Sequence, residues 1–276
     1  MASAPIRITE PGDPRIAGFA SIRERDLTGR QGRFIAEGTV VLRMLAAAHA
    51  AGNGFAAEAV LLLENRVAGV ADIIETLPDD VPVYVATAAV LDAIAGFHMH
   101  RGVLALGRRA APPNVAELAA RLPEKSLVLA ACGIANHDNI GSMFRNAAAF
   151  GADAVFLDET SCDPLYRKAI RVSVGSVLTV PYARGESGGE MLALLAGEGF
   201  QIWGLSPRGE VPVHAIPPAP RIALVAGTEG EGLPDAILSS FRTARIPQRP
   251  GLDSLNVATA SGIALYQIAL SGGRIA

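Results

Sequence analysis

Residues 136–157 read NHDNIGSMFRNAAAFGADAVFL and combine a helical apolar pattern with several polar side chains. The apolar positions recur at helical spacing and define one face, made of Ile140, Met143, Phe144, Ala147 and Ala148. Asn139, Ser142 and Arg145 follow at intervals of three and form a polar stripe beside that face. A solvated outer face explains this stripe as well as a binding site does, so the other segments must decide between them.

The composition describes a globular chain without a general attraction to nucleic acid. The 276 residues are 50% hydrophobic, which is enough for two domains with full cores. The net charge of -3 means that a nucleic-acid partner would have to meet a local basic patch. Lys125 and Lys168 are the only lysines, so arginine, which pairs bidentately with phosphate, carries nearly all the positive charge.

The cysteines and the N-terminus bear on the cellular compartment. Cys132 and Cys162 match no CxxC or zinc-binding spacing, and we expect both to be reduced thiols in the core. The first residues show no basic segment followed by an apolar one, and no uncharged apolar run reaches about 18 residues. These features predict a cytoplasmic protein.

The hydrophobic pattern divides the chain into two α/β regions. Residues 1–20 read as an irregular arm, 21–110 as a small α/β domain, 111–125 as a linker and 126–276 as a larger α/β domain. The small domain is predicted to hold helices at 37–51, 67–76 and 88–95 and strands at 59–64, 81–86 and 102–109. The strands predicted in the large domain are 126–134, 154–158, 177–182, 201–206, 221–227 and 244–247. Its predicted helices are 139–150, 164–174, 189–197, 234–241 and 256–271.

Alternating apolar strands and helices imply a parallel sheet covered on both faces, and ligands of such sheets bind beyond the carboxyl ends of the strands. Three segments fall there: the stretch quoted above, GTEGEGLP at 227–234 and IPQRPGLDSLNVATASGIALYQ at 246–267. The three glycines of the second segment let the backbone turn sharply and approach a ligand. In the third, Ser254 and Asn256 stand at a loop-to-helix junction, where simple helix caps are also common.

Several ligand classes lack their sequence signatures. The turn after the first strand of the large domain reads ACGIANHDNIGS and has no GxGxxG, which disfavours a nucleotide-dependent oxidoreductase. The chain contains neither a GxxxxGK[ST] phosphate loop nor a GxSxG nucleophile motif. The five histidines show no metal-binding spacing, so no metal site is predicted.

In this order, the three segments make the chain resemble the SpoU/TrmH family of RNA 2'-O-ribose methyltransferases. The first family motif, NxGaxxRxAxxFGa, is similar to residues 139–152, with Asn139 and Arg145 in place. The second motif, GxEGxGL, is similar to 227–233, and the third, IPxxG followed by SLNV, to 246–257. Three positions depart from residues often seen in the family: Thr228 replaces an asparagine, Gln248 a methionine and Gln267 a glutamate.

The resemblance implies a fold and a cofactor that periodicity cannot show. It implies a parallel-sheet α/β trefoil knot, the SPOUT domain, at 126–276 and a smaller L30e-like α/β domain that binds RNA at 21–110. It implies a homodimer and S-adenosylmethionine as the cofactor. The cofactor contacts that it implies are Gly227, Ile246, Leu255, Leu205, Thr228 and Gly232.

The resemblance also selects residues for chemistry. Arg145 would pair with an RNA phosphate and stabilise the developing alkoxide, because a guanidinium does not readily deprotonate. Asn139, Glu229, Ser254 and Asn256 would orient the ribose and the arginine by hydrogen bonds. His137 stands beside the first motif but is not part of the family pattern. The predicted RNA contacts are Arg145, Ser142, Arg30, Arg33 and Arg101, for the last three of which a solvated surface role is the alternative.

The expected substrate is ribosomal RNA, because two-domain members of the family commonly act on it. Transfer RNA is the alternative within the enzyme class. A non-catalytic RNA-binding or ribosome-assembly protein is the alternative outside it, and the complete set of site residues argues against that interpretation.

Overall fold

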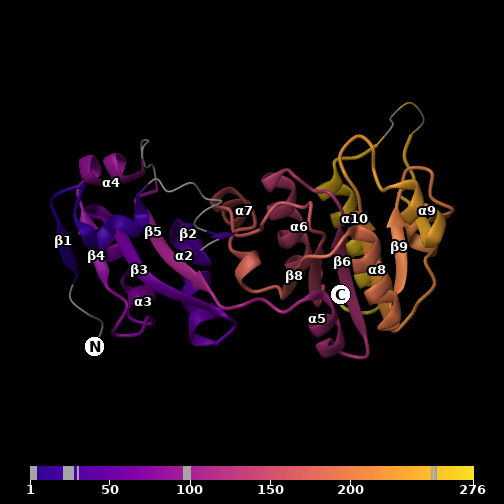
Figure 1. The fold of residues 1–276 in the computed structure, drawn as a ribbon, viewed down its shortest axis with the longest axis horizontal. Helices are drawn as coiled ribbons and strands as arrows, with labels where there is room; N and C mark the ends of the chain where they lie inside the picture. Colours follow the sequence, from indigo (N-terminus) through magenta and orange to yellow (C-terminus); the bar gives the residue numbers. More distant parts are fainter. Residues whose placement is uncertain (1–4, 21–27, 30, 96–100, 250, 252–253) are drawn as a thin grey trace. The chain divides into compact units, whose positions relative to one another are not determined.

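The computed structural model describes residues 5–20, 28–29, 31–95, 101–249, 251 and 254–276 (Figure 1). The chain forms two compact units, residues 1–111 with 165–179 and residues 112–164 with 180–276. Each unit contains one β-sheet. Within the described ranges, none of the helices is both long enough and apolar enough to cross a membrane.

The first unit is built on a five-stranded mixed sheet in the order β1-β4-β3-β5-β2. β1 and β3 run parallel to β4, whereas β5 runs antiparallel to β3 and β2. The strands are β1 (Ile6–Ile8), β2 (Arg33–Glu37), β3 (Phe55–Leu63), β4 (Val83–Ala86) and β5 (Val103–Arg109). The α-helices are α2 (Thr39–Ala50), α3 (Ala71–Ile74), α4 (Ala88–Ala95) and α7 (Arg167–Val172). Short 3-10 helices are η1 (Pro14–Phe19), η2 (Glu64–Arg66), η3 (Ala68–Val70) and η4 (Ser176–Leu178).

Two segments of the first unit differ from the sequence interpretation. The arm read as irregular contains β1 and η1, because Ile8, Ile16 and Phe19 bury their side chains against the sheet. The 165–179 segment, placed by sequence in the larger domain, belongs to the first unit. There α7 packs beside β2, and Arg167 Nε lies 2.9 Å from Glu37 Oε2 in a largely buried ion pair.

The second unit contains seven parallel strands in the order β10-β12-β9-β11-β6-β7-β8. This confirms the predicted parallel α/β sheet. The strands are β6 (Ser126–Ala131), β7 (Ala154–Leu157), β8 (Tyr182–Arg184), β9 (Gln201–Leu205), β10 (Val211–Pro212), β11 (Arg221–Ala226) and β12 (Arg242–Arg245). The helices are α5 (Val115–Arg121), α6 (His137–Ala149), α8 (Gly188–Gly197), α9 (Asp235–Ser240), α10 (Val257–Ser271) and the 3-10 helix η5 (Val213–Ala215).

Helices cover both faces of this sheet. Alternate residues of a strand point to opposite faces, and every residue of β6 is buried. Val128 and Ala130 of β6 belong to a core that also contains side chains of α5, α8 and α9. Leu127, Leu129 and Ala131 face the other side, where α6 and α10 pack against each other and against the sheet (Figure 1). Burial on both faces explains the unbroken apolar runs of these strands.

The segment read as a linker contains helix α5. Asn114 and Glu117 form a capping box that starts it, and Val115, Leu118 and Ala119 are buried in the core of the second unit. The strand predicted at 177–182 is instead η4 followed by β8. In both places a short element with nearby prolines carries too little periodicity to be identified from the pattern.

Candidate functional site

The second unit has a cavity of about 620 Å³ at the carboxyl ends of its central strands. β12, β9 and β11 are neighbours and run parallel, so the segments that follow them meet at one edge of the sheet. The cavity is lined by residues 205–208, 226–233 and 254–257 together with Asp235, Leu238, Ala244, Ile246, Gln248 and Ala260. Its size lies in the range of small-molecule sites.

The glycine-rich turn forms the floor of this cavity. Thr228 and Gly232 pair as an isolated bridge, with both N to O distances at 3.1 Å. Gly230 and Gly232 have φ angles of +97° and +76°, which favour glycine. A Cβ on Gly227 would lie 2.4 Å from the carbonyl carbon of Gly232 and from the nitrogen of Leu233. The sequence predicted that these glycines let the backbone approach a ligand. In the structure, Gly227 also lets the backbone pack closely against itself, and this contact shapes the turn.

Two asparagines and a carboxylate join the three motifs at the rim of the cavity. Asn139 Nδ2 donates to Glu229 Oε1 at 2.5 Å, and Asn256 Nδ2 donates to the same oxygen at 2.9 Å. Asn256 Nδ2 also lies 3.0 Å from Asn139 Oδ1. Asn139 is buried, with 6% of its surface exposed, whereas Glu229 and Asn256 are exposed. The cluster places a carboxylate at the solvent edge with its orientation fixed.

Asn256 has a second task as the cap of α10. Its Oδ1 accepts hydrogen bonds from the backbone nitrogens of Ala258 and Thr259, at 3.0 and 3.2 Å. The sequence offered a helix cap and a site residue as alternatives for this position, and the structure shows both contacts on one side chain. The cap fixes the amide so that its nitrogen faces Asn139 and Glu229.

Asp158, at the end of β7, holds the loop that leads from β6 to α6. Its two oxygens lie 3.0 and 3.1 Å from the backbone nitrogen of Gly133. Oδ1 also accepts from the nitrogen and hydroxyl of Ser161, and Oδ2 accepts from Thr160 Oγ1 at 2.7 Å. Burial and, secondarily, the Asp158 charge raise the pKa of the neighbouring Cys132 thiol to about 12. Asp158 thus supports the helix that carries Asn139.

The structure brings most of the predicted site residues together. The predicted cofactor contacts, together with Glu229, Ser254 and Asn256, line the cavity, and Asn139 touches two of them. Those cofactor contacts are Leu205, Gly227, Thr228, Gly232, Ile246 and Leu255.

Arg145 is not among the residues that line the cavity. A helix turns about 100° per residue, so positions three apart drift by about 60° at each step. Asn139 is accordingly buried, Ser142 is half-buried and Arg145 is exposed on the outer side of α6. The stripe inferred from the sequence therefore winds from the cavity rim to the surface.

The predicted RNA contacts of the first unit have mixed environments. Arg33 Nε lies 2.6 Å from Glu58 Oε2, and Arg108 Nε lies 2.9 Å from Glu58 Oε1. Arg101 is exposed. Arg30 lies outside the described residues. The shared carboxylate of Glu58 offsets part of the positive charge of this sheet face.

Sequence reasoning gave no role to several residues at the cavity. Gln248, Glu231, Asp235 and Arg208 line it. Arg208 follows β9, so the rule that ligands bind beyond strand ends could have found it. Glu231 lies within the glycine turn and Asp235 follows it, and their residue type gave no separate signal. No cluster of three or more potential metal-ligating side chains occurs in the part of the chain that the structure describes.

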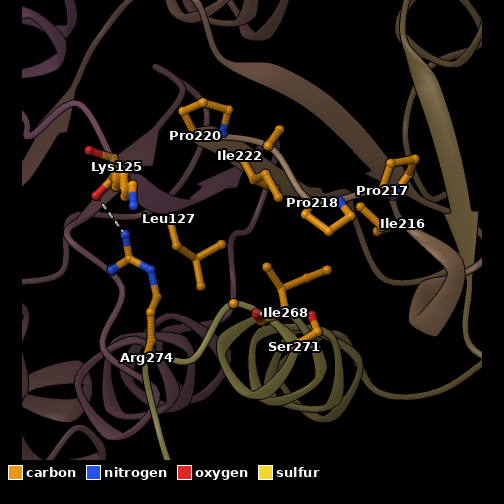
Figure 2. Close-up of a pocket in the computed structure, with 13 residues that line it drawn as sticks. Lys125, Leu127, Ile216, Pro217, Pro218, Pro220, Ile222, Ile268, Ser271 and Arg274 are labelled. Carbon is orange, nitrogen blue, oxygen red and sulfur yellow. Dashed lines mark hydrogen bonds between the residues drawn. The ribbon is translucent and has the colours of Figure 1, made fainter.

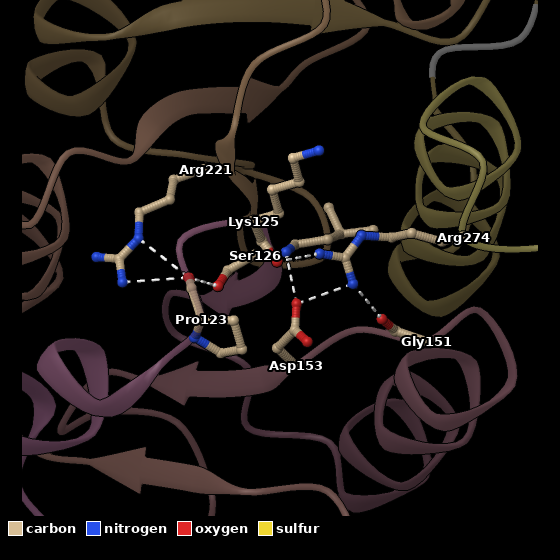
Figure 3. A network of polar contacts seen from close by, with 8 residues as sticks. Pro123, Lys125, Ser126, Gly151, Asp153, Arg221 and Arg274 are labelled. Carbon is tan, nitrogen blue, oxygen red and sulfur yellow. Dashed lines mark hydrogen bonds and ion pairs between the residues drawn. The ribbon is translucent and has the colours of Figure 1, made fainter.

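A second cavity, of about 420 Å³, lies at the amino ends of β6 and β11. Pro217, Pro218 and Pro220 line one side, and Ile268 and Ser271 of α10 line the other (Figure 2). The arginine that lines this cavity already has partners within the protein. Arg274 donates to the carbonyl oxygens of Gly151 and Lys125 and forms an ion pair with Asp153 (Figure 3). The motifs converge on the other cavity, which we take as the candidate site.

Comparisons with known proteins identify the family. Residues 126–266 match the model of the SpoU rRNA Methylase family. The chain is 38% identical over 280 residues to an uncharacterized tRNA/rRNA methyltransferase of Mycobacterium bovis, covering 97% of this chain and 93% of the relative. A solved RNA 2'-O ribose methyltransferase is 27% identical with a TM-score of 0.79, covering 98% of this chain and 100% of that one. The AdoMet-bound rRNA methyltransferase of Sinorhizobium meliloti is 22% identical with a TM-score of 0.78, covering 96% and 98%.

Proposed function

This chain belongs to the SpoU rRNA methylase family of RNA methyltransferases, and we propose that it transfers a methyl group from S-adenosylmethionine to a ribose 2'-hydroxyl of ribosomal RNA. The observation that carries this proposal is the contact of Asn139, Glu229 and Asn256, one from each motif, at the rim of the carboxyl-end cavity. The similarity to a solved ribose methyltransferase, at 27% identity over 98% of this chain, supports the same position on the nucleotide.

The lining of the cavity fits the proposed cofactor. Leu205, Ile246 and Leu255 supply apolar walls for a flat base. Among the described residues that line the cavity, three carboxylates, Glu229, Glu231 and Asp235, stand against a single arginine, Arg208. This negative balance favours a ligand with net positive charge, and the sulfonium and ammonium groups of S-adenosylmethionine provide it. The cofactor supplies an electrophilic methyl group, and the glycine turn and Leu255 hold it.

The cluster at the rim orients the ribose. The Glu229 carboxylate is held by two amides and reaches solvent, so it can accept a hydrogen bond from a ribose hydroxyl. Ser254, also exposed at the cavity, adds a second polar contact. Placing the hydroxyl in line with the methyl group supplies much of the rate enhancement of such a displacement.

We propose that Arg145 acts on the RNA from the surface of α6, pairing with a phosphate and stabilising the developing alkoxide. Arg145 lies on the helix that packs against α10, whose exposed face carries Ile263, Tyr266 and Leu270. Three large apolar side chains at helical spacing on one surface indicate an interface. A homodimer formed there would place Arg145 at the subunit boundary, and Leu270→Asp should convert it to a monomer in sedimentation experiments.

The decisive experiment compares Arg145→Ala with Arg121→Ala. Arg121 is an exposed arginine on α5 and serves as the matched control. Arg145→Ala should abolish methyl transfer to RNA and leave the Kd for S-adenosylmethionine within twofold, whereas Arg121→Ala should change neither. Normal turnover in Arg145→Ala would refute this role.

The substrate RNA and its binding domain are part of the same proposal. We propose that the first unit, which includes the 21–110 region, binds RNA as an L30e-like domain. We propose further that the second unit, which begins with α5 and includes most of 126–276, is a knotted methyltransferase domain, in a cytoplasmic enzyme. Ribose methylation mapped across total RNA, with and without the protein, should show one lost site in ribosomal RNA. A lost site in transfer RNA would favour the alternative that the relative's name also contains. An unchanged map would favour a non-catalytic RNA-binding protein.

A further inference from the structure

The carboxyl-end cavity and the rim residue Asn139 are carried by different elements. The residues that line the cavity come from the ends of β9, β11 and β12, from the segments that follow these strands and from the start of α10. Among the described residues, none of those that line it belongs to α6. Asn139 stands on α6 and reaches the rim through its contacts with Glu229 and Asn256. The packing of α6 against α10 therefore sets where Asn139 lies relative to the cavity.

Asn146 forms a polar contact between these two helices. It follows Asn139 by seven residues, which is nearly two full turns, so both side chains lie on the same face of α6. Asn146 Nδ2 donates to the carbonyl oxygen of Ala258, in the first turn of α10, at 2.7 Å. Asn256, which contacts Asn139, caps that same turn. Both asparagines of α6 thus bind the beginning of α10.

The surface of α10 leaves room for the Asn146 side chain. Gly262 lies one turn after Ala258, and a Cβ on it would lie 2.8 Å from Asn146 Nδ2 and 3.1 Å from Asn146 Cγ. The three atoms nearest to that Cβ all belong to the Asn146 side chain. Glycine inside a helix is less favourable than alanine, so the space that it leaves for the amide explains its place here.

We propose that Asn146 is a positioning residue for methyl transfer, because its bond to Ala258 fixes α6 on α10 and so keeps Asn139 beside Glu229 and Asn256. This inference rests on the proposed function of the carboxyl-end site. Arg145 precedes Asn146 on α6, so the same bond fixes the side from which Arg145 meets RNA. A misplacement of about 1 Å can lower a rate about 100-fold, so one bond between the helices can affect turnover.

The double variant Asn146→Ala/Gly262→Ala removes the bond and fills the space that the amide leaves. Alanine at position 146 lacks the three atoms that a Cβ on residue 262 would meet. Alanine is also favoured over glycine in a helix, so the Tm should stay within about 3 °C of the native value. The kcat for RNA methylation should nevertheless fall about 10- to 100-fold. The Kd for S-adenosylmethionine should stay within about threefold, because the residues that line the cavity are unchanged.

Ser261→Ala is the matched control. The Ser261 hydroxyl is buried and donates to the same carbonyl oxygen of Ala258, at 3.0 Å, but this bond lies within α10. Its loss should lower the Tm by about 2–4 °C, the effect of one hydrogen bond in a chain of this size, and leave kcat within about twofold of native. The two variants therefore separate the attachment of α6 from the stability of α10.

A native kcat in the double variant would overturn the inference. An equal loss of kcat in Ser261→Ala would also overturn it, because Asn146 would then act only through the stability of α10.

A crystal structure of the double variant gives a result that does not depend on turnover. It should show Asn139 Oδ1 beyond hydrogen-bond distance of Asn256 Nδ2, from which it lies 3.0 Å in the native protein. If the native protein methylates no RNA, the proposed function fails, and this crystal structure alone then decides the role of Asn146. An unchanged contact between Asn139 and Asn256 would overturn that role whether or not the native protein is active.

Discussion

The loops at the two ends of the seven-stranded sheet are held in place by different kinds of residues. Beyond the carboxyl ends, glycines form the turn at 227–232, and amide and carboxylate side chains face a cavity. At the amino ends, prolines rigidify the entry to β11, and Arg221 and Arg274 donate to backbone carbonyl oxygens. The arginine side chains at the amino end therefore form hydrogen bonds with backbone groups of the protein itself. The side chains at the carboxyl end are instead arranged around a space for a ligand.

The largest effect on cofactor binding should come from adding one methyl group to the glycine turn. Gly227→Ala would put a Cβ at 2.4 Å from the backbone of Gly232, and the turn cannot close without shifting. Overpacking of this kind costs about 1–3 kcal/mol, so affinity for S-adenosylmethionine should fall about 100-fold. Calorimetric titration of the purified variant measures this directly.

Gly197→Ala is the control for that substitution. Gly197 ends α8 on the amino-end side of the sheet, and a Cβ there would have no atom within 4 Å. Alanine is favoured over glycine in a helix by about 1 kcal/mol, so this variant should be as stable as the native protein or more so and bind normally. Equal affinities in the two variants would remove the distinction between the ends.

The next effect should fall on turnover rather than on binding. Glu229→Gln keeps the shape of the side chain, and its carbonyl oxygen can still accept from the amides of Asn139 and Asn256, but the negative charge and the second acceptor oxygen are lost. We expect kcat/KM for RNA to fall about 100-fold, as when a positioned polar group is lost from an active site. The Kd for S-adenosylmethionine should change by less than threefold.

Asp153→Asn makes the same chemical change at the amino end. Asp153 accepts from the nitrogen of Leu127 at 2.8 Å and pairs with Arg274 at 2.9 Å. It should lower stability and leave turnover of the folded enzyme unchanged. A similar fall in turnover for both variants would mean that the cluster at Glu229 has no special part in catalysis.

A purely structural effect is expected from the amino-end arginine. Arg274→Ala removes hydrogen bonds to Gly151 and Lys125, at 3.0 and 2.8 Å, and the ion pair to the partly buried Asp153. Unfolding free energy should fall by about 1–2 kcal/mol in urea, with the m-value unchanged. Cofactor affinity should be native, and a loss of affinity would show that the two ends are coupled through α10.

The local hydrophobic pattern of the sequence could predict the type of sheet and the position of the site, but not the order of the strands. Apolar strands alternating with helices predicted a parallel sheet, and this placed the segments at 139, 227 and 254 beyond strand ends. Strand order was not accessible, because nothing in the local pattern says that β9 lies between β11 and β12. Contacts such as Asn139 with Glu229 depend on that order, and the family motifs rather than periodicity brought these residues together.

Local chemistry explains the elements that were missed. Asn114 and Glu117, the capping box of α5, were readable, but the prolines before them favoured a linker. The exposed position of Arg145 follows from the drift of a three-residue repeat around a helix, which a stripe drawn from the sequence ignores.

The smallest effect concerns the thiol packed beneath the carboxyl-end loops. Burial, and after it the charge of Asp158, raises the pKa of Cys132 to about 12, so at pH 8 only about 10⁻⁴ of it is thiolate, against about a quarter of a free cysteine. In a Cys162→Ser background, iodoacetamide should therefore modify Cys132 at least about 100-fold more slowly than free cysteine, and faster as the pH rises. Saturating S-adenosylmethionine should leave this rate nearly unchanged, because the thiol is already protected by the core under the loop that Asp158 holds. Rapid modification at pH 8, suppressed by the cofactor, would instead mean that the loop opens in the ligand-free protein and that the carboxyl end is organised only on binding.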